Sequence, residues 1–139
     1  MEETYRGSVF SWECDEVGHM NVRYYVAKFD EASWQLMAKV GLTPKYLRSN
    51  NKSVVSVEQH IKYINELLPG DLVVVQSKVL EIKKSFIKFK HVMVNSQTHK
   101  IAAEMTVVGV HLDLIARKPT SIPQTIANTI ISKIVEHSN

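Results

Sequence analysis

The sequence has a single cysteine and none of the common zinc-binding patterns. Cys14 is its only cysteine, so the chain cannot form an internal disulfide, and we expect a reducing compartment, the cytoplasm. No C-x-x-C or H-E-x-x-H pattern supplies a set of zinc ligands, and no G-x-S-x-G marks a serine nucleophile. The usual sequence signals of metal-dependent and serine-dependent hydrolysis are therefore both absent.

The sequence also lacks a long apolar run. No segment approaches the ~20 apolar residues that a membrane-spanning helix needs, and "MEETYRGSVF" has no basic region followed by an apolar run. We therefore expect neither a membrane span nor a secretory signal. Apolar residues make up 45% and charged residues 22% of the 139 residues, which is typical of a globular protein. We expect a single domain over residues 1–139.

Acidic residues are absent from one segment, Ile82 to Ala103. Five lysines fall in it: Lys83, Lys84, Lys88, Lys90 and Lys100. The whole chain has a net charge of +3, and this segment favours an anionic ligand, although lysines on a strand also serve simply to solvate it. The chain has no interleaved exposed aromatics and no nucleic-acid-binding motif, so we do not expect nucleic acid as the partner.

The residues from Val22 to Val40 have the periodicity of a long helix. Apolar residues recur at positions 22, 26, 29, 36, 37 and 40, which is helical spacing. Gly41 follows as a C-terminal stop and Pro44 lies just beyond it. The next residues, "PKYLRSN", are expected to form a turn.

From residue 53 onward the pattern changes to that of β-strands. In "SVVSVEQHIKYIN", one face is predicted to hold Val55, Val57, Ile61 and Tyr63. Short turns such as "LLPGD" and "KKS" separate this segment from three further strand segments, and "QTIANTIISKIVE" predicts a closing helix. The expected fold class is α+β, a curved antiparallel sheet wrapped around one long helix.

One predicted strand, "LVVVQSKVLEI", carries apolar residues on both faces. Val73, Val75 and Val79 alternate there with Leu72, Val74 and Leu80. Apolar surface on both faces, together with uncovered sheet edges, is typical of a protein with a partner subunit. We therefore expect a homodimer.

Four residues with polar or special backbone roles gather in "ECDEVGHMN", directly before the predicted helix: Asp15, Gly18, His19 and Asn21. The first interpretation is a helix cap. Asn21 would accept hydrogen bonds from unpaired amides, Gly18 would supply an unusual backbone angle, and Asp15 would complement the positive helix end. This interpretation leaves His19 unexplained.

The second interpretation is a metal site built from Cys14, Asp15 and His19. A zinc site needs three or four ligands, and four other histidines are scattered along predicted strands: His60, His91, His99 and His111. A single cysteine and isolated histidines are weak indications of such a site.

The third interpretation is catalytic. If Asn21 is the N-cap, the backbone N–H of Val22 has no intrahelical partner and lies at the positive end of the helix. Such an amide can stabilise a carbonyl oxygen that becomes negative. Asp15, in the preceding loop, would bring a carboxylate to the same carbonyl carbon, where it can attack directly or activate water.

The pattern W-x-x-D-x-x-G-H-M-N-x-x-x-Y, followed by F-D-E-A on a long helix, resembles the hot-dog fold acyl-CoA thioesterases. The most similar branch is the one related to 4-hydroxybenzoyl-CoA thioesterase. Two later segments, "IKYINELLPGD" and "IKKSFIKFKHVM", agree with the family, as does the C-terminal "IP" followed by a helix. The resemblance covers almost the whole chain and implies active sites at a dimer interface.

By position, the resemblance implies that Asp15 is the catalytic carboxylate and that the Val22 backbone amide polarises the thioester carbonyl. His19 and Asn21 match the G-H-M-N segment, which shapes the loop or contacts the acyl group or water. The resemblance implies hydrolysis of an acyl-CoA to free acid and CoA by a homodimer or dimer of dimers. No metal or separate cofactor is expected, since coenzyme A is part of the substrate.

Coenzyme A carries several phosphates, so the lysine-rich turn is a candidate site for it. We expect Lys83 and Lys84, with Ser85 beside them, to meet these phosphates. The acyl group stays open: a small-acyl specialist, such as the betainyl-CoA thioesterases, and a long-chain hydrolase differ mainly in pocket depth. The alternative function is a non-catalytic acyl-CoA or fatty-acyl binding protein on the same fold.

Overall fold

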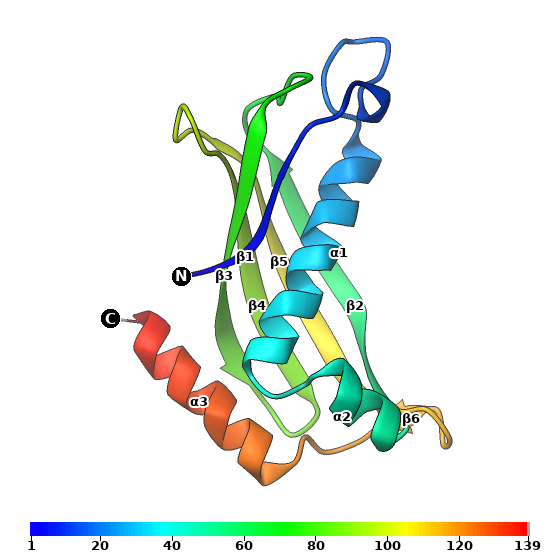
Figure 1. The fold of residues 1–139 in the computed structure, drawn as a ribbon. Coiled ribbons are helices and arrows are strands. Elements are labelled where there is room, and N and C mark those ends of the chain that lie inside the picture. The colour runs from blue at the N-terminus through cyan, green and yellow to red at the C-terminus, as the bar shows by residue number, and fades with distance from the viewer. Residues whose placement is uncertain (139) are drawn as a thin grey trace.

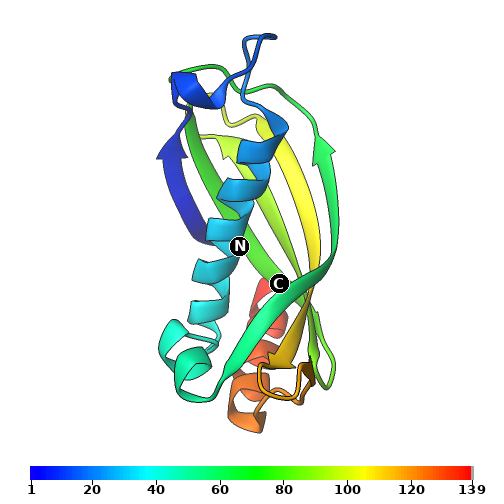
Figure 2. The same cartoon turned by 90° about the vertical axis from the view of Figure 1, so that its right-hand side faces the viewer.

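Six antiparallel strands form one sheet, which curves around helix α1 (Figures 1 and 2). The computed structural model describes residues 1–138. Its elements, in chain order, are β1 (Glu2–Ser8), the short 3₁₀ helix η1 (Ser11–Glu13), α1 (Val22–Lys39), α2 (Pro44–Ser49), β2 (Lys52–Tyr63), β3 (Leu72–Ile82), β4 (Phe86–Asn95), β5 (Ile101–Asp113), β6 (Lys118–Pro119) and α3 (Gln124–Ser138). The strand order is β1-β3-β4-β5-β2, with β6 paired to β5. The predicted fold class is confirmed.

Helix α1 forms because its apolar residues recur on one face. Tyr25, Phe29, Ala32 and Leu36 follow one another at steps of three or four and are all buried against the sheet. Burial of each large side chain contributes about 1.5–3 kcal/mol to folding. The helix ends before Gly41, whose φ of +103° is the left-handed conformation that glycine adopts readily. The predicted helix and its stop signal are confirmed.

Two details of the sequence prediction for this helix are wrong. Val22 and Val26, which were expected on the apolar face, are 56% and 37% exposed, because the buried face runs through Tyr25 instead. The predicted turn after Gly41 is also wrong, since Pro44–Ser49 forms helix α2. Thr43 caps that helix by accepting a hydrogen bond from the Tyr46 amide, and proline fits the first helical turn.

Strand β2 departs from the predicted alternation at a β-bulge. Ser56 pairs with Gly109 and Glu58 pairs with Val108, so Val57 is an extra residue without a partner on β5. The bulge reverses which residues face the core. As a result Val54 and Ile61 pack against the core, whereas Val57 is 58% exposed. The prediction that Val55 and Val57 share a face with Ile61 is therefore wrong.

The closing helix α3 packs against β3, beside the position where β1 begins (Figure 1). Ile130 is fully buried in the same core as α1, and Lys133 forms an ion pair of 3.1 Å with Glu2. Among residues 1–138, no helix combines the length and the apolar character that a membrane crossing requires.

A buried ion pair ties the segment after β1 to helix α1. Lys28 Nζ lies 3.0 Å from Glu13 Oε2, and both side chains are at most 6% exposed. Burial opposes the charge on Lys28, but its hydrogen bonds to Glu13 and to the Tyr5 hydroxyl outweigh that effect and raise its pKa. The other Glu13 oxygen accepts a hydrogen bond from the Phe10 amide at 2.8 Å. The carboxylate of Glu13 thereby fixes the backbone just before Asp15.

Lys28→Met should lower the free energy of unfolding by roughly 3–5 kcal/mol, because it leaves the Glu13 carboxylate buried without its cation. Urea unfolding measures the change. The matched control is Lys39→Met in the exposed last turn of the same helix, which should change stability by less than ~0.5 kcal/mol. Equal losses in the two variants would contradict a structural role for the buried pair.

Candidate active site

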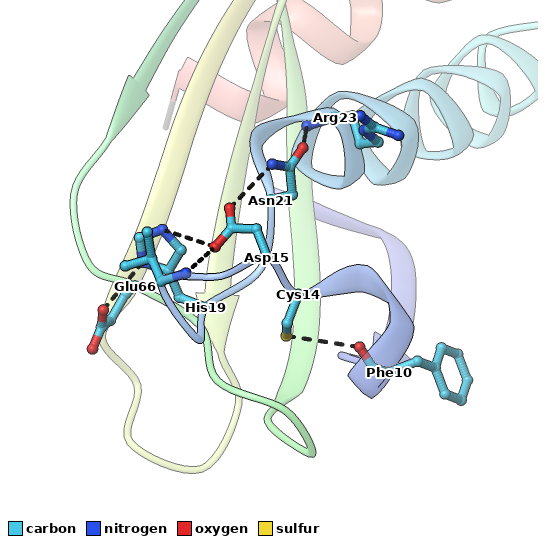
Figure 3. A network of polar contacts seen from close by, with 8 residues as sticks. Phe10, Cys14, Asp15, His19, Asn21, Arg23 and Glu66 are labelled. Atoms are coloured by element: carbon cyan, nitrogen blue, oxygen red, sulfur yellow. Dashed lines mark hydrogen bonds and ion pairs between the residues drawn. The ribbon is translucent and has the colours of Figure 1, made fainter.

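The loop from Cys14 to Met20 is a tight hairpin at one end of the sheet. Cys14 and Met20 form an antiparallel bridge, and inside it the Asp15 amide donates to the His19 carbonyl at 3.1 Å. Gly18 lies at the tip with a φ of +90°, so a residue with a side chain would be strained there. This hairpin brings Asp15 and His19 to the same side of the loop (Figure 3).

Asn21 links the hairpin to helix α1 through both ends of its side-chain amide. Its Oδ1 accepts a hydrogen bond from the Arg23 amide at 3.1 Å, which is N-cap geometry. Its Nδ2 donates to Asp15 Oδ2, also at 3.1 Å (Figure 3). The prediction that Asn21 caps the helix is confirmed, and the cap also holds the Asp15 carboxylate.

Asp15 is held in its ionised form. The hydrogen bond from Asn21 is the largest cause that lowers the pKa of Asp15, and it outweighs the opposing effect of partial burial. The Val17 amide donates to Asp15 Oδ1 at 3.0 Å and lowers the pKa further. The side chain remains 18% exposed, so a substrate can reach a carboxylate that carries its full charge at neutral pH.

Val22 is the first residue of α1, as predicted. Within residues 1–138, its N–H donates to no backbone or side-chain acceptor. The amide therefore retains its donor capacity at the positive end of the helix dipole. An oxygen that gains negative charge would be stabilised at this point.

His19 lies between two carboxylates. Its Nε2 is 4.0 Å from Asp15 Oδ1, and its Nδ1 is 3.2 Å from Oε2 of Glu66 in the loop between β2 and β3 (Figure 3). Glu66 was not among the predicted site residues, and it lies 47 residues from His19 in the sequence. The contact between His19 and Glu66 depends on a hydrogen bond of 2.8 Å from the Met20 amide to the Leu67 carbonyl. No local pattern in the sequence predicts that pairing.

The predicted coenzyme A residues lie elsewhere. Lys83, Lys84 and Ser85 form the turn between β3 and β4, at the end of the sheet opposite to Asp15 (Figure 1). Lys83 forms an exposed ion pair of 3.6 Å with Glu81, and Ser85 is buried, with its carbonyl accepting from the His111 amide. Within a single chain, the predicted coenzyme A residues are therefore far from Asp15.

The metal interpretation finds no assembled ligand set. Within residues 1–138, no three His, Cys, Asp or Glu side chains are grouped so that they could hold a metal ion. Cys14 is instead directed to the Phe10 carbonyl at 3.8 Å (Figure 3), and burial raises its thiol pKa. Two other histidines, His91 and His111, are fully buried and hydrogen-bonded inside the fold.

A hollow of about 390 Å³ lies between α1 and β2, further along the helix than the Asp15 loop. Its walls combine polar and apolar groups, among them Ser33 and Trp34 of α1, Gln59 of β2 and Phe89 of β4. Ser33 bonds to His91 Nε2 at 2.8 Å. Neither Asp15 nor His19 lines this hollow.

The chain resembles known proteins in its family pattern, its sequence and its fold. A family model described as the thioesterase-like superfamily matches residues 9–130. The chain is 23% identical over 116 residues to the L-carnitine dehydrogenase/betainyl-CoA thioesterase of Agrobacterium fabrum. That match covers 84% of this chain and 24% of the relative, so the chain spans about a quarter of the relative's length.

Among solved structures, a Staphylococcus aureus protein in complex with CoA is similar with a TM-score of 0.88 and 17% identity, over 97% of this chain and 87% of that one. A 1,4-dihydroxy-2-naphthoyl-CoA thioesterase from Synechocystis has a TM-score of 0.79 and 16% identity, over 91% of this chain and 93% of that one. At these identities the likeness shows the fold. Because the family model covers most of the sequence, including the hairpin and helix α1, this chain belongs to the thioesterase-like superfamily and has its hot-dog fold.

Proposed function

We propose that this chain is an acyl-CoA thioester hydrolase. The observation that carries the proposal is the double role of Asn21, which holds the Asp15 carboxylate and caps the helix whose first amide, that of Val22, is free. A carboxylate and an unpaired amide at one helix end are the two groups that hydrolysis of a thioester needs. Membership of the thioesterase-like superfamily and the CoA-related names of its relatives support the assignment.

In the proposed reaction the thioester carbonyl oxygen accepts a hydrogen bond from the Val22 amide, which stabilises it as it becomes negative. Asp15 either takes a proton from the attacking water or attacks the carbonyl carbon itself. In the water route, the new C–O bond forms, the C–S bond breaks, and the proton on Asp15 passes to the CoA sulfur. The products are the free acid and CoA, and no group outside the chain and its substrates is required.

We propose that the active form is a homodimer or a dimer of dimers in the cytoplasm, with each chain as one domain. Strand β2 is an edge of the sheet, twelve residues long, and its bulge residue Val57 is 58% exposed. A long exposed edge strand of this kind offers unpaired backbone groups to a second chain. Because the turn of Lys83, Lys84 and Ser85 is far from Asp15 of its own chain, its proposed contact with CoA phosphates requires the active site of another copy.

Asp15→Asn should lower kcat for acyl-CoA hydrolysis roughly 10²–10⁴-fold, because the amide can neither accept the proton nor attack the carbonyl. Release of free thiol from acyl-CoAs of several chain lengths measures the rate. The matched control is Glu16→Gln, an exposed neighbour that should retain the parent rate. Equal rates for parent and Asp15→Asn would rule out this assignment of Asp15, and binding without hydrolysis of any acyl-CoA would favour the binding protein instead.

Asn21→Ala should raise the pKa of Asp15, because it removes the hydrogen bond that favours the ionised carboxylate. It should also lower stability by about 1 kcal/mol through loss of the N-cap. A carbon-13 NMR titration of labelled aspartate follows the pKa. Asn21→Asp separates the two effects, since it keeps the cap acceptor but adds a second negative charge beside Asp15. An unchanged Asp15 titration in both variants would show that Asn21 does not tune the carboxylate.

Light scattering at micromolar concentration should give two or four times the chain mass of 15.8 kDa. Val57→Lys should raise the dissociation constant of the dimer by roughly tenfold or more, since a charge on the β2 edge opposes its pairing. Ile115→Lys provides the control, because Ile115 is 78% exposed in the turn between β5 and β6. A monomer in the parent protein would refute the dimer.

A further inference from the structure

His19 lies between Asp15, in its own hairpin, and Glu66, in a loop that is distant in the sequence. Glu66 Oε2 lies 3.2 Å from Nδ1 of the imidazole, and Asp15 Oδ1 lies 4.0 Å from Nε2, so the ring stands between two carboxylates (Figure 3). The distance to Glu66 is that of a hydrogen bond, whereas the distance to Asp15 is too long for a direct one.

The hydrogen bond to Glu66 determines the tautomer of His19. An ionised carboxylate only accepts hydrogen bonds, so Nδ1 must carry the proton and donate it to Glu66. In the neutral ring, Nε2 is then an acceptor. Nε2 and Asp15 Oδ1 are therefore two acceptors that face each other across 4.0 Å.

A water molecule matches two such acceptors, because it has two O–H donors and can span groups that are too far apart to bond directly. One hydrogen would point to Asp15 Oδ1 and the other to His19 Nε2. The water oxygen would keep a lone pair free for the carbonyl carbon, and Asp15 is the carboxylate that takes the proton.

We propose that Glu66 is a positioning residue for thioester hydrolysis, which acts by fixing His19 so that His19 and Asp15 together orient the attacking water. This inference rests on the proposed function and selects its water route. As the water oxygen bonds to the carbonyl carbon, one water proton moves to Asp15 and the other stays on oxygen, hydrogen-bonded to His19. The C–S bond then breaks, and the proton on Asp15 is transferred to the CoA sulfur.

Hydrogen bonds of the residues on either side of Glu66 fix the backbone at this point of the loop. The preceding residue, Asn65, bonds to β5 twice: its amide donates to the Ala102 carbonyl at 3.1 Å and its side chain to the Ile101 carbonyl at 2.8 Å. The following residue, Leu67, is fully buried and its carbonyl accepts from Met20. Glu66 itself is 60% exposed at its side chain, so the carboxylate has no packing role that would explain it.

Glu66→Ala should lower kcat about 10- to 100-fold with little change in KM, because the water is misplaced while the substrate still binds. Glu66→Gln keeps an oxygen that accepts from Nδ1, so it should recover most of the activity. Glu16→Ala is the matched control: it removes one negative charge from the hairpin and should leave kcat unchanged. Thermal melting confirms that each variant is folded.

A double-mutant cycle with His19→Ala tests whether Glu66 acts through His19. His19→Ala should lower kcat at least as much as Glu66→Ala, and adding Glu66→Ala to it should have no further effect. If Glu66→Ala retains the parent kcat, or lowers it equally without His19, the positioning role is overturned. If the parent protein hydrolyses no acyl-CoA at all, the proposed function fails first, and the two failures are thus distinguished.

Discussion

The geometry of the candidate site depends on how the first turn of α1 satisfies its backbone amides. A helix leaves its first N–H groups without intrahelical partners, and each must be capped, solvated or used. Asn21 caps the Arg23 amide with its oxygen and holds Asp15 with its nitrogen, while the Val22 amide stays free. The side chain of Asn21 therefore fixes the position of the Asp15 carboxylate relative to the unpaired Val22 amide.

A buried ion pair between Glu13 and Lys28 stabilises that arrangement. The carboxylate of Glu13 accepts hydrogen bonds from Lys28, in the second turn of α1, and from the Phe10 amide, in the segment after β1. The backbone carbonyl of Glu13 accepts from the Asn21 amide at 2.9 Å. An ion pair in this environment is costly to desolvate and contributes little net stability, but it tolerates few alternative arrangements. We interpret the ion pair as an interaction that fixes the position of the hairpin relative to helix α1.

Local features of this protein could be read from the sequence, whereas features that depend on distant pairing could not. The span of α1, its Asn21 cap and its Gly41 stop follow from residue types within a few positions of one another. The bulge at Val57 inverts the faces of β2 because β5 pairs around it, and strand alternation alone carries no sign of that. Helix α2 was missed because its six residues span fewer than two turns, too few for a helical repeat of apolar residues to be recognised.

The same distinction divides the candidate site. Asp15, His19, Asn21 and Val22 lie within eight residues, so one hairpin and one cap bring them together, and their spacing alone suggested that they would be neighbours. Glu66 reaches His19 only because the loop between β2 and β3 passes beside the residues just before α1, where the Met20 amide bonds to the Leu67 carbonyl. We propose that the fold thereby adds to the local motif a residue, Glu66, that orients His19. The motif alone would place a carboxylate near a thioester, whereas directing the attacking water would require the sheet as well.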